Sequence, residues 1–197
     1  MFTEKDNTYW SAFGAVIKGD FVERKYWHSP KVRYEYKGLE VVFDTYYFTS
    51  TVGAKSHESF ITRVYAKFTY REPLKAKIEK ASLFNRLVNL FNGQLYKTKD
   101  RKFDRCFHIH ATHPKILGLF HSTLRQKLID LSIEGMFIDT YDGIWGDPLP
   151  KNQYEISIYL DQSRLTLEEL VALKALFEQI LDALYVQFDT IAAIKPL

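Results

Sequence analysis

The chain has 197 residues, a length that fits one ordinary domain or two very small ones. Hydrophobic residues make up 46% of it and charged residues 26%, which is close to the globular average and excludes disorder, collagen and a continuous coiled coil. A single cysteine excludes an internal disulfide and any multi-cysteine zinc or iron–sulfur site, and the net charge is only +3.

Targeting signals are not evident in the sequence. The N-terminus, which begins Met1-Phe2-Thr3-Glu4, lacks the basic and then apolar order of a signal peptide. No stretch reaches the ~18 apolar residues that a membrane span needs. We therefore expect a cytoplasmic protein without a membrane span.

The first part of the chain predicts a helix followed by strands. Apolar residues recur at helical spacing over residues 3–18, and Gly19 suits the position after a helix end. Residues 31–49 alternate and predict a hairpin around Lys37-Gly38. The Ser/Thr/Gly stretch 49–59 predicts a loop. Two further strands are expected, at residues 60–70 and 74–80.

A second part carries more helices. Residues 82–92 predict a helix whose apolar face is buried, with Phe84, Leu87, Val88 and Phe91 on it. The remaining expected elements follow in chain order: a strand at 103–111, a helix that begins at Thr112 or His113 with Pro114 in its first turn, strands at 131–138, around Ile144-Trp145 and at 154–160, and a last helix from the capping box Thr166-Leu167-Glu168-Glu169 to about Phe188.

This order predicts an α+β fold, with mainly antiparallel sheets and packing helices, because the helices do not alternate regularly with single strands. We expect a single domain over residues 1–197. The order also leaves open two duplicated helix-β-β-β halves, 1–80 and 103–197, joined by a helical insert at 82–102.

Several segments resemble a family of uncharacterised bacterial proteins that carry a domain of unknown function. The resemblance covers most of the chain, and it implies a fold without an assigned activity. It departs from the family pattern at Cys106, His108 and His110. The segments that carry it are Trp27-His28-Ser29-Pro30-Lys31-Val32, Ser82-Leu83-Phe84-Asn85-Arg86-Leu87, Lys102-Phe103-Asp104-Arg105 and Asp142-Gly143-Ile144-Trp145-Gly146.

The best chemical candidates are the clustered histidines. Residues two apart on a strand share a face, so Cys106, His108 and His110 are expected to project together, and His113 or His121 would supply a third metal ligand. The competing interpretation is that Phe107, Ile109 and Ala111 form the buried side, which leaves the histidines as ordinary solvated residues. We favour this second interpretation and expect no bound metal or cofactor.

Two charged segments each allow a binding site or an ordinary solvated surface. Asp139, Asp142 and Asp147 place three carboxylates in one predicted turn, where a hard cation is one interpretation and ordinary turn chemistry the other. Residues 71–105 hold ten basic and four acidic residues, a net charge of +6. A nucleic-acid domain usually carries a larger basic excess over the whole chain, so nucleic acid is an unlikely partner and a solvated surface is favoured.

We therefore expect a non-enzymatic binding or protein-interaction module that forms a homodimer. The alternative is a metal-dependent enzyme that uses the His108, His110 and His113 cluster. Convergent polar groups in one pocket would favour an enzyme, whereas a groove or a symmetric interface would favour the binding module.

Overall fold

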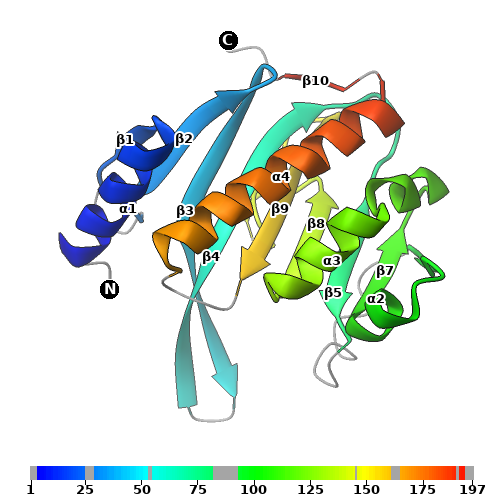
Figure 1. Ribbon diagram of the computed structural model, residues 1–197, viewed down its shortest axis with the longest axis horizontal. Helices are drawn as coiled ribbons and strands as arrows, with labels where there is room; N and C mark the ends of the chain where they lie inside the picture. Colours follow the sequence, from blue (N-terminus) through cyan, green and yellow to red (C-terminus); the bar gives the residue numbers. More distant parts are fainter. Residues whose placement is uncertain are drawn as a thin grey trace.

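A ten-stranded antiparallel sheet forms the frame of the protein, and helices lie across one of its faces (Figure 1). The computed structural model describes residues 4–24, 29–52, 55–81, 93–144, 146–160, 165–189 and 191–193, with the backbone alone for 47–52 and 55–59. The strand order is β1-β2-β3-β4-β9-β8-β5-β7-β6, and β10 lies beside β4. The α+β prediction is confirmed. The division into two half-units stays a prediction.

The elements have the following bounds. The strands are β1 (Asp20–Val22), β2 (Lys31–Tyr36), β3 (Leu39–Val52), β4 (Lys55–Thr69), β5 (Ala76–Lys80), β6 (Gln94–Tyr96), β7 (Phe107–Ala111), β8 (Gly135–Asp139), β9 (Gln153–Leu160) and β10 (Ala192–Ala193). The helices are α1 (Glu4–Ile17), α2 (Arg101–Cys106), the 3-10 helix η2 (Pro114–Leu119), α3 (Ser122–Asp130) and α4 (Leu167–Gln187).

The β2–β3 hairpin forms where the sequence predicts it. Its turn residues Lys37 and Gly38 have φ angles of 49° and 81°, the left-handed values that a two-residue turn between twisted strands requires. The predicted loop at 49–59 is wrong, because β3 and β4 stay paired from Val41↔Ala66 to Val52↔Lys55. Threonine and valine favour extended backbone, and this preference outweighs the loop signal of the serines and glycine.

Three elements of the second half differ from prediction. The strand predicted at 103–111 begins only at Phe107, and residues 103–106 belong to the helix α2. The Asp100 carboxylate caps this helix by accepting hydrogen bonds from the backbone N–H groups of Lys102 and Phe103. The predicted strand at 131–138 begins only at Gly135, since Ser132 has a φ of 50° after α3. Ile144 lies in a turn beside the single bridge Tyr141↔Pro148 instead of in a strand.

The helix expected from His113 onward is divided in two. His113 caps η2, and the backbone then leaves the helical region at Phe120 (φ −102°, ψ 60°) before α3 begins. The helix predicted at 82–92, with its apolar face, lies outside the described residues.

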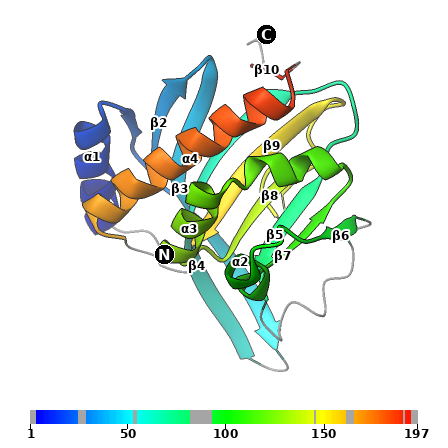
Figure 2. The ribbon, with the colours of Figure 1, turned by 45° about the vertical axis from the view of Figure 1, so that its right-hand side comes forward.

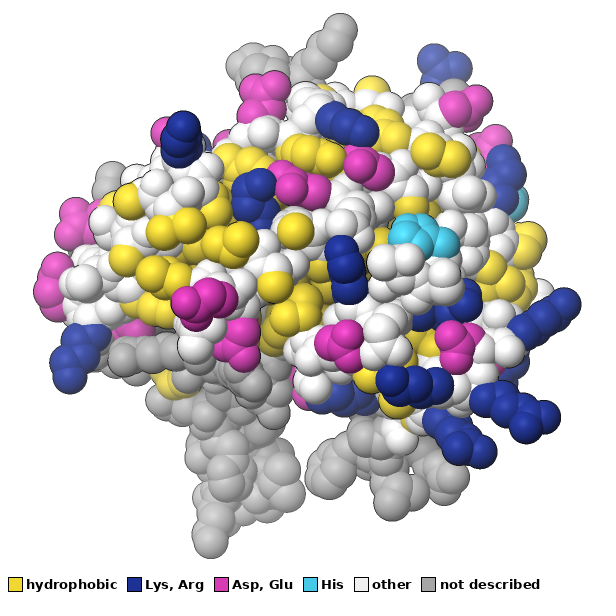
Figure 3. All heavy atoms as spheres, in the orientation of Figure 1, with side chains coloured by type: hydrophobic (Ala, Val, Ile, Leu, Met, Phe, Trp, Pro, Cys, Tyr) yellow, Lys and Arg dark blue, Asp and Glu magenta, His cyan; other side chains and the backbone are white. Residues whose placement is uncertain are grey.

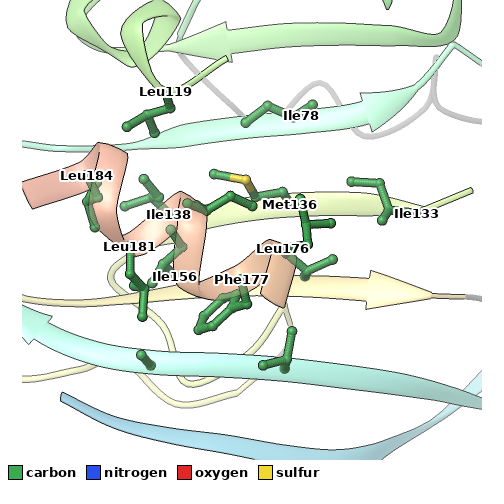
Figure 4. Packing of buried hydrophobic residues seen from close by; sticks show 14 of the residues in the cluster. Ile78, Leu119, Ile133, Met136, Ile138, Ile156, Leu176, Phe177, Leu181 and Leu184 are labelled. Carbon is green, nitrogen blue, oxygen red and sulfur yellow. The ribbon is translucent and has the colours of Figure 1, made fainter. Parts of the chain in front are cut away.

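The core lies between the sheet and its helices. α4 crosses the sheet diagonally, and α1 and α3 lie on the same side of it (Figures 1 and 2). Seven large apolar side chains of α4 are buried there: Leu170, Leu173, Leu176, Phe177, Ile180, Leu181 and Leu184. Figure 4 shows Phe177 and Leu181 over Ile138 of β8 and Ile156 of β9. No helix in the described part of the chain is long and apolar enough to cross a membrane.

The predicted capping box of α4 is confirmed, and it supports a prediction about stability. The Thr166 hydroxyl accepts a hydrogen bond from the N–H of Glu169, and the Glu169 carboxylate accepts one from the N–H of Thr166. Thr166→Ala should lower the free energy of unfolding by about 1 kcal/mol, because one N–H of the first turn loses its partner. Urea denaturation would measure this, with Glu169→Gln as a control that keeps the acceptor. Equal stability of Thr166→Ala and the native protein would contradict it.

Candidate functional site

The face of the sheet opposite the helices carries the polar side chains, and we call it the open face. On β4, Val64, Ala66 and Phe68 point into the core, so the alternate residues Arg63 and Tyr65 and the following Lys67 point to the open face. The registers align these with open-face residues of the neighbouring strands. Arg63 lies between Asp44 of β3 and Tyr159 of β9, and Lys67 lies opposite Glu155.

A buried ion pair forms the centre of this face. The Arg63 guanidinium donates from Nε to Asp44 Oδ1 at 2.9 Å and from Nη2 to Asp44 Oδ2 at 2.6 Å. Only 6% of Arg63 and 8% of Asp44 is exposed. The guanidinium carbon lies 4.1 Å from the ring centre of Tyr65 and 4.8 Å from that of Tyr46. Burial lowers the pKa of Arg63, but the charge of Asp44 and its hydrogen bonds outweigh this and raise it.

The remaining nitrogen of Arg63 faces two further carboxyl groups. Nη1 lies 3.7 Å from Glu155 Oε1 and 4.0 Å from Asp142 Oδ1, both longer than a hydrogen bond. Lys67 Nζ reaches Asp142 Oδ2 at 2.9 Å. We call Asp44, Arg63, Lys67, Asp142 and Glu155, together with Tyr159, the Arg63 cluster.

The two carboxyl groups have opposite pKa shifts. Burial raises the pKa of Glu155 to about 8; the charge of Arg63 opposes this and that of Asp142 adds to it. Burial also acts to raise the pKa of Asp142, but the hydrogen bond and the charge of Lys67 outweigh it and lower the pKa. At neutral pH Glu155 is therefore mostly a protonated acid beside an ionised Asp142.

Several buried atoms of the cluster retain hydrogen-bonding capacity. Within the described residues, Arg63 Nη1, both carboxyl oxygens of Glu155 and the hydroxyl of Tyr159 have no partner in hydrogen-bond geometry, although Glu155 lies close enough to Asp142, and Tyr159 close enough to Ser157, for these neighbours to shift the pKa of each group. The Tyr159 ring is held edge-on by Tyr46 and Phe137, with centroid distances of 5.8 and 5.6 Å. A buried polar group without a partner costs roughly 1–3 kcal/mol, so these atoms are places where a further polar group would be stabilised.

A hollow of about 960 Å³ adjoins the cluster across the first four strands of the sheet. Arg63, Asp44 and Asp142 border it, whereas Glu155 and Tyr159 do not. The other lining residues are Asp20, Ser29, Lys31, Arg33, Tyr34, Glu35, Gly38, Leu39, Glu40, Val42, Tyr65, Lys67 and Ala193. This volume is within the range of sites for small molecules and short peptides.

The sequence-predicted histidines do not converge. His108 and His110 lie on the open face of β7, paired across the ladder with Glu79 and Lys77. His113 Nδ1 accepts a hydrogen bond from the N–H of Lys115 and caps η2, and His121 is exposed at the start of α3. Cys106 ends α2 and packs against the core. The expectation that Cys106 shares a face with His108 and His110 is therefore wrong, because α2 ends where the strand begins.

No group of three or more His, Cys, Asp or Glu side chains suited to a metal ion occurs among the residues that the structure describes. We predict that the protein, purified without a histidine tag, holds no stoichiometric transition metal, because two solvated imidazoles alone make a weak site. Elemental analysis tests this prediction. About one equivalent of zinc, iron or manganese that disappears in His108→Ala/His110→Ala would contradict it.

The predicted acidic turn is largely engaged in ion pairs, whereas the basic segment is so engaged only through Lys75, Lys77 and Lys80 among its described cations. Asp139 pairs with Lys75 at 2.7 Å, and Asp142 pairs with Lys67, so these carboxylates face different lysines instead of one cation. Asp147 is exposed. In the basic segment Lys77 pairs with Glu79 at 2.8 Å. Arg71 is exposed after β4. Five other exposed cations of the segment gather at the edge of the molecule beside α2 (Figure 3): Lys97, Lys99, Arg101, Lys102 and Arg105.

The raised pKa of Glu155 predicts a pH dependence of stability. The group faces Arg63 and Lys67 of β4, Asp142 of the adjoining turn and Asp139 of β8. Its folded pKa of about 8 is above the ordinary value of 4.5, so the folded state holds a proton that the unfolded state releases. The free energy of unfolding should therefore fall as pH rises from about 4.5 to about 8, by at most about 1.4 kcal/mol per pH unit.

Urea denaturation between about pH 5 and about pH 8.5 measures this dependence. Glu155→Gln removes the titrating group and should flatten the curve over that range. An unchanged slope in Glu155→Gln would show that other groups cause the dependence.

A scan against protein-family models finds no match for this chain, and searches of curated proteins and of solved structures find none either. The resemblance to an uncharacterised bacterial family therefore stays a prediction.

Proposed function

We propose that the protein is a non-enzymatic binding module that holds a peptide-like ligand with both acidic and basic groups in the hollow on the open face. The observation that carries this proposal is the composition of the hollow, which combines four cationic and five carboxylate side chains around a rigid floor. The cations are Lys31, Arg33, Arg63 and Lys67, and the carboxylates are Asp20, Glu35, Glu40, Asp44 and Asp142. A cytoplasmic location and homodimer formation are further parts of the proposal.

Some of these charges have no counter-ion among the residues that the structure describes. In the described part of the chain, Lys31, Asp20 and Glu35 form no ion pair. Glu35 also lies directly opposite Glu40 across the β2–β3 ladder, an arrangement of like charges that is unfavourable. The Arg33 guanidinium lies 3.7 Å from the Glu40 carboxylate and offsets only part of the repulsion between Glu35 and Glu40. A ligand with charges of both signs would complement this surface.

The floor of the hollow is preorganised. The bidentate Arg63–Asp44 pair and the stacked ring of Tyr65 fix the side chains in one arrangement. A fixed floor lowers the entropy that binding has to overcome. The same rigid, aromatic and charged surface suits a polypeptide, whose backbone groups and side chains offer both donors and acceptors.

Fluorescence polarisation with labelled hexapeptides built from Lys, Glu, Tyr and Gly tests the proposal. Some of these peptides should bind, and Lys31→Glu should weaken the tightest of them about tenfold or more by reversing a charge in the hollow. Lys115→Glu is the matched control, since Lys115 is exposed in η2 on the helical side, and it should bind like the native protein. Equal loss in both variants, or no binding by any peptide, would contradict the proposal.

A further inference from the structure

The Asp142 carboxylate occupies the point at which the cations of the Arg63 cluster converge. It accepts from Lys67 Nζ at 2.9 Å and lies 4.0 Å from Arg63 Nη1. The side chain of Asp142 is 46% exposed, whereas that of Arg63 is 7% exposed. The half-exposed carboxylate of Asp142 thus lies over the buried guanidinium of Arg63.

The surrounding groups are mostly donors. In the part of the chain that the structure describes, Arg63 Nη1 and the Tyr159 hydroxyl are buried donors without a partner in hydrogen-bond geometry. Glu155 is mostly protonated at neutral pH and can donate from its carboxyl group. A ligand carboxylate in place of Asp142 would carry the same charge beside Glu155 and keep the pKa of Glu155 raised as Asp142 does. The two cations Arg63 and Lys67 would then face one ionised carboxylate of the protein, that of Asp44, which leaves a net charge of +1 for the ligand. The cluster without Asp142 therefore has the charge and the donors that an anion needs.

The turn that carries Asp142 lies close against the cluster because of Gly143. This residue has a φ of 78°, and a Cβ there would lie 2.9 Å from Arg63 Nη1 and 3.0 Å from the Tyr46 ring. Only glycine permits this approach without strain. The backbone hydrogen bonds of the turn from Asp142 to Asp147 and from Leu149 to Thr140 join its two sides to each other, so they would stay intact if the turn moved away from the cluster.

We propose that Arg63 and Lys67 form a carboxylate-binding subsite of the open-face hollow, and that Asp142 fills this subsite as an internal substitute until a ligand carboxylate replaces it. The inference rests on the proposed binding function and gives the anionic group of the ligand a defined position. A ligand carboxylate would reach both Lys67 and Nη1 of Arg63 at hydrogen-bond distance. Asp142 does not reach Arg63 in this way, since its Oδ1 lies 4.0 Å from Nη1.

Acetate titrated into the protein, followed by calorimetry, tests the subsite directly. Asp142→Asn removes the competing charge and keeps the size of the side chain. It should bind acetate at least about tenfold more tightly than the native protein, because in the native protein acetate must displace the Asp142 carboxylate from Lys67. Asp147→Asn makes the same charge change at an exposed position of the same turn and should bind like the native protein. Asp142→Asn/Lys67→Ala should lose the gain.

The outcomes separate this inference from the proposed function. If Asp142→Asn and Asp147→Asn bind acetate equally, or if Asp142→Asn binds inorganic phosphate more tightly than acetate, the carboxylate subsite is wrong. Peptide binding that is sensitive to Lys31→Glu would still support the hollow as a binding site. Conversely, a gain in acetate affinity without any peptide binding would support the subsite and contradict the peptide ligand. Thermal unfolding of each variant confirms that it is folded.

Discussion

Replacing Arg63 with alanine should lower the free energy of unfolding by about 3–5 kcal/mol, because it leaves the Asp44 carboxylate charged, buried and without a partner. Both hydrogen bonds between the two side chains are lost, as is the stacking of the guanidinium between Tyr46 and Tyr65. Urea denaturation monitored by tryptophan fluorescence would measure the change.

Two further variants show whether the buried pair causes this effect. Arg63→Met/Asp44→Leu removes both charges and should be more stable than Arg63→Ala alone, since no unpaired charge remains. Arg33→Ala removes an arginine of the same face whose side chain is 45% exposed and whose ion pair is 3.7 Å long, and it should change stability by no more than about 1 kcal/mol. Similar losses in Arg63→Ala and Arg33→Ala would contradict the importance of the buried pair.

Phe177→Ala should cost about 3–5 kcal/mol, because it opens a cavity between α4 and the sheet. Phe177 is completely buried, and its ring lies over β8 and β9 (Figure 4). Val186→Ala, on the same helix at a position that is 78% exposed, is the control and should change stability by less than about 0.5 kcal/mol. If Phe177→Ala lowered the free energy of unfolding as little as Val186→Ala does, the packing of α4 on the sheet would not contribute to the stability of the core.

The sequence correctly predicts those helix ends and turns that depend only on residues close together in the chain. The capping box fixes the start of α4, and the Lys37-Gly38 turn fixes the β2–β3 hairpin; both act within a few residues. The errors arose where two local signals competed. In residues 49–59 serine and glycine indicate a loop, whereas threonine and valine favour extended backbone. Asp100 caps a helix where alternating residues indicated a strand.

The Arg63 cluster could not be predicted from the sequence because it depends on pairing between distant strands. The β4–β9 register places Glu155 opposite Lys67 and Tyr159 opposite Arg63, and a turn far along the chain supplies Asp142. On β4 alone, Arg63 looks like the polar residue of an ordinary alternating strand. In the sequence, Asp142 belongs to the acidic turn with Asp139 and Asp147, for which a hard cation is one interpretation. The structure instead places Asp142 against the cations Lys67 and Arg63.

The histidines show the opposite case, in which residues that are close in the sequence lie on different elements of the structure. His108 and His110 share a face as strand geometry predicts. His113 and His121 serve as the N-caps of η2 and α3, and their backbone positions direct them elsewhere.

Amide shift mapping by NMR, with the tightest hexapeptide added to the labelled protein, tests most directly whether the open face is the binding face. The account predicts the largest shifts at residues 31–44, 63–67 and 139–144, which border the hollow or form the adjoining turn, and small shifts along Leu167–Gln187 on the opposite side. Largest shifts along α1 or α4, with residues 63–67 unchanged, would contradict it.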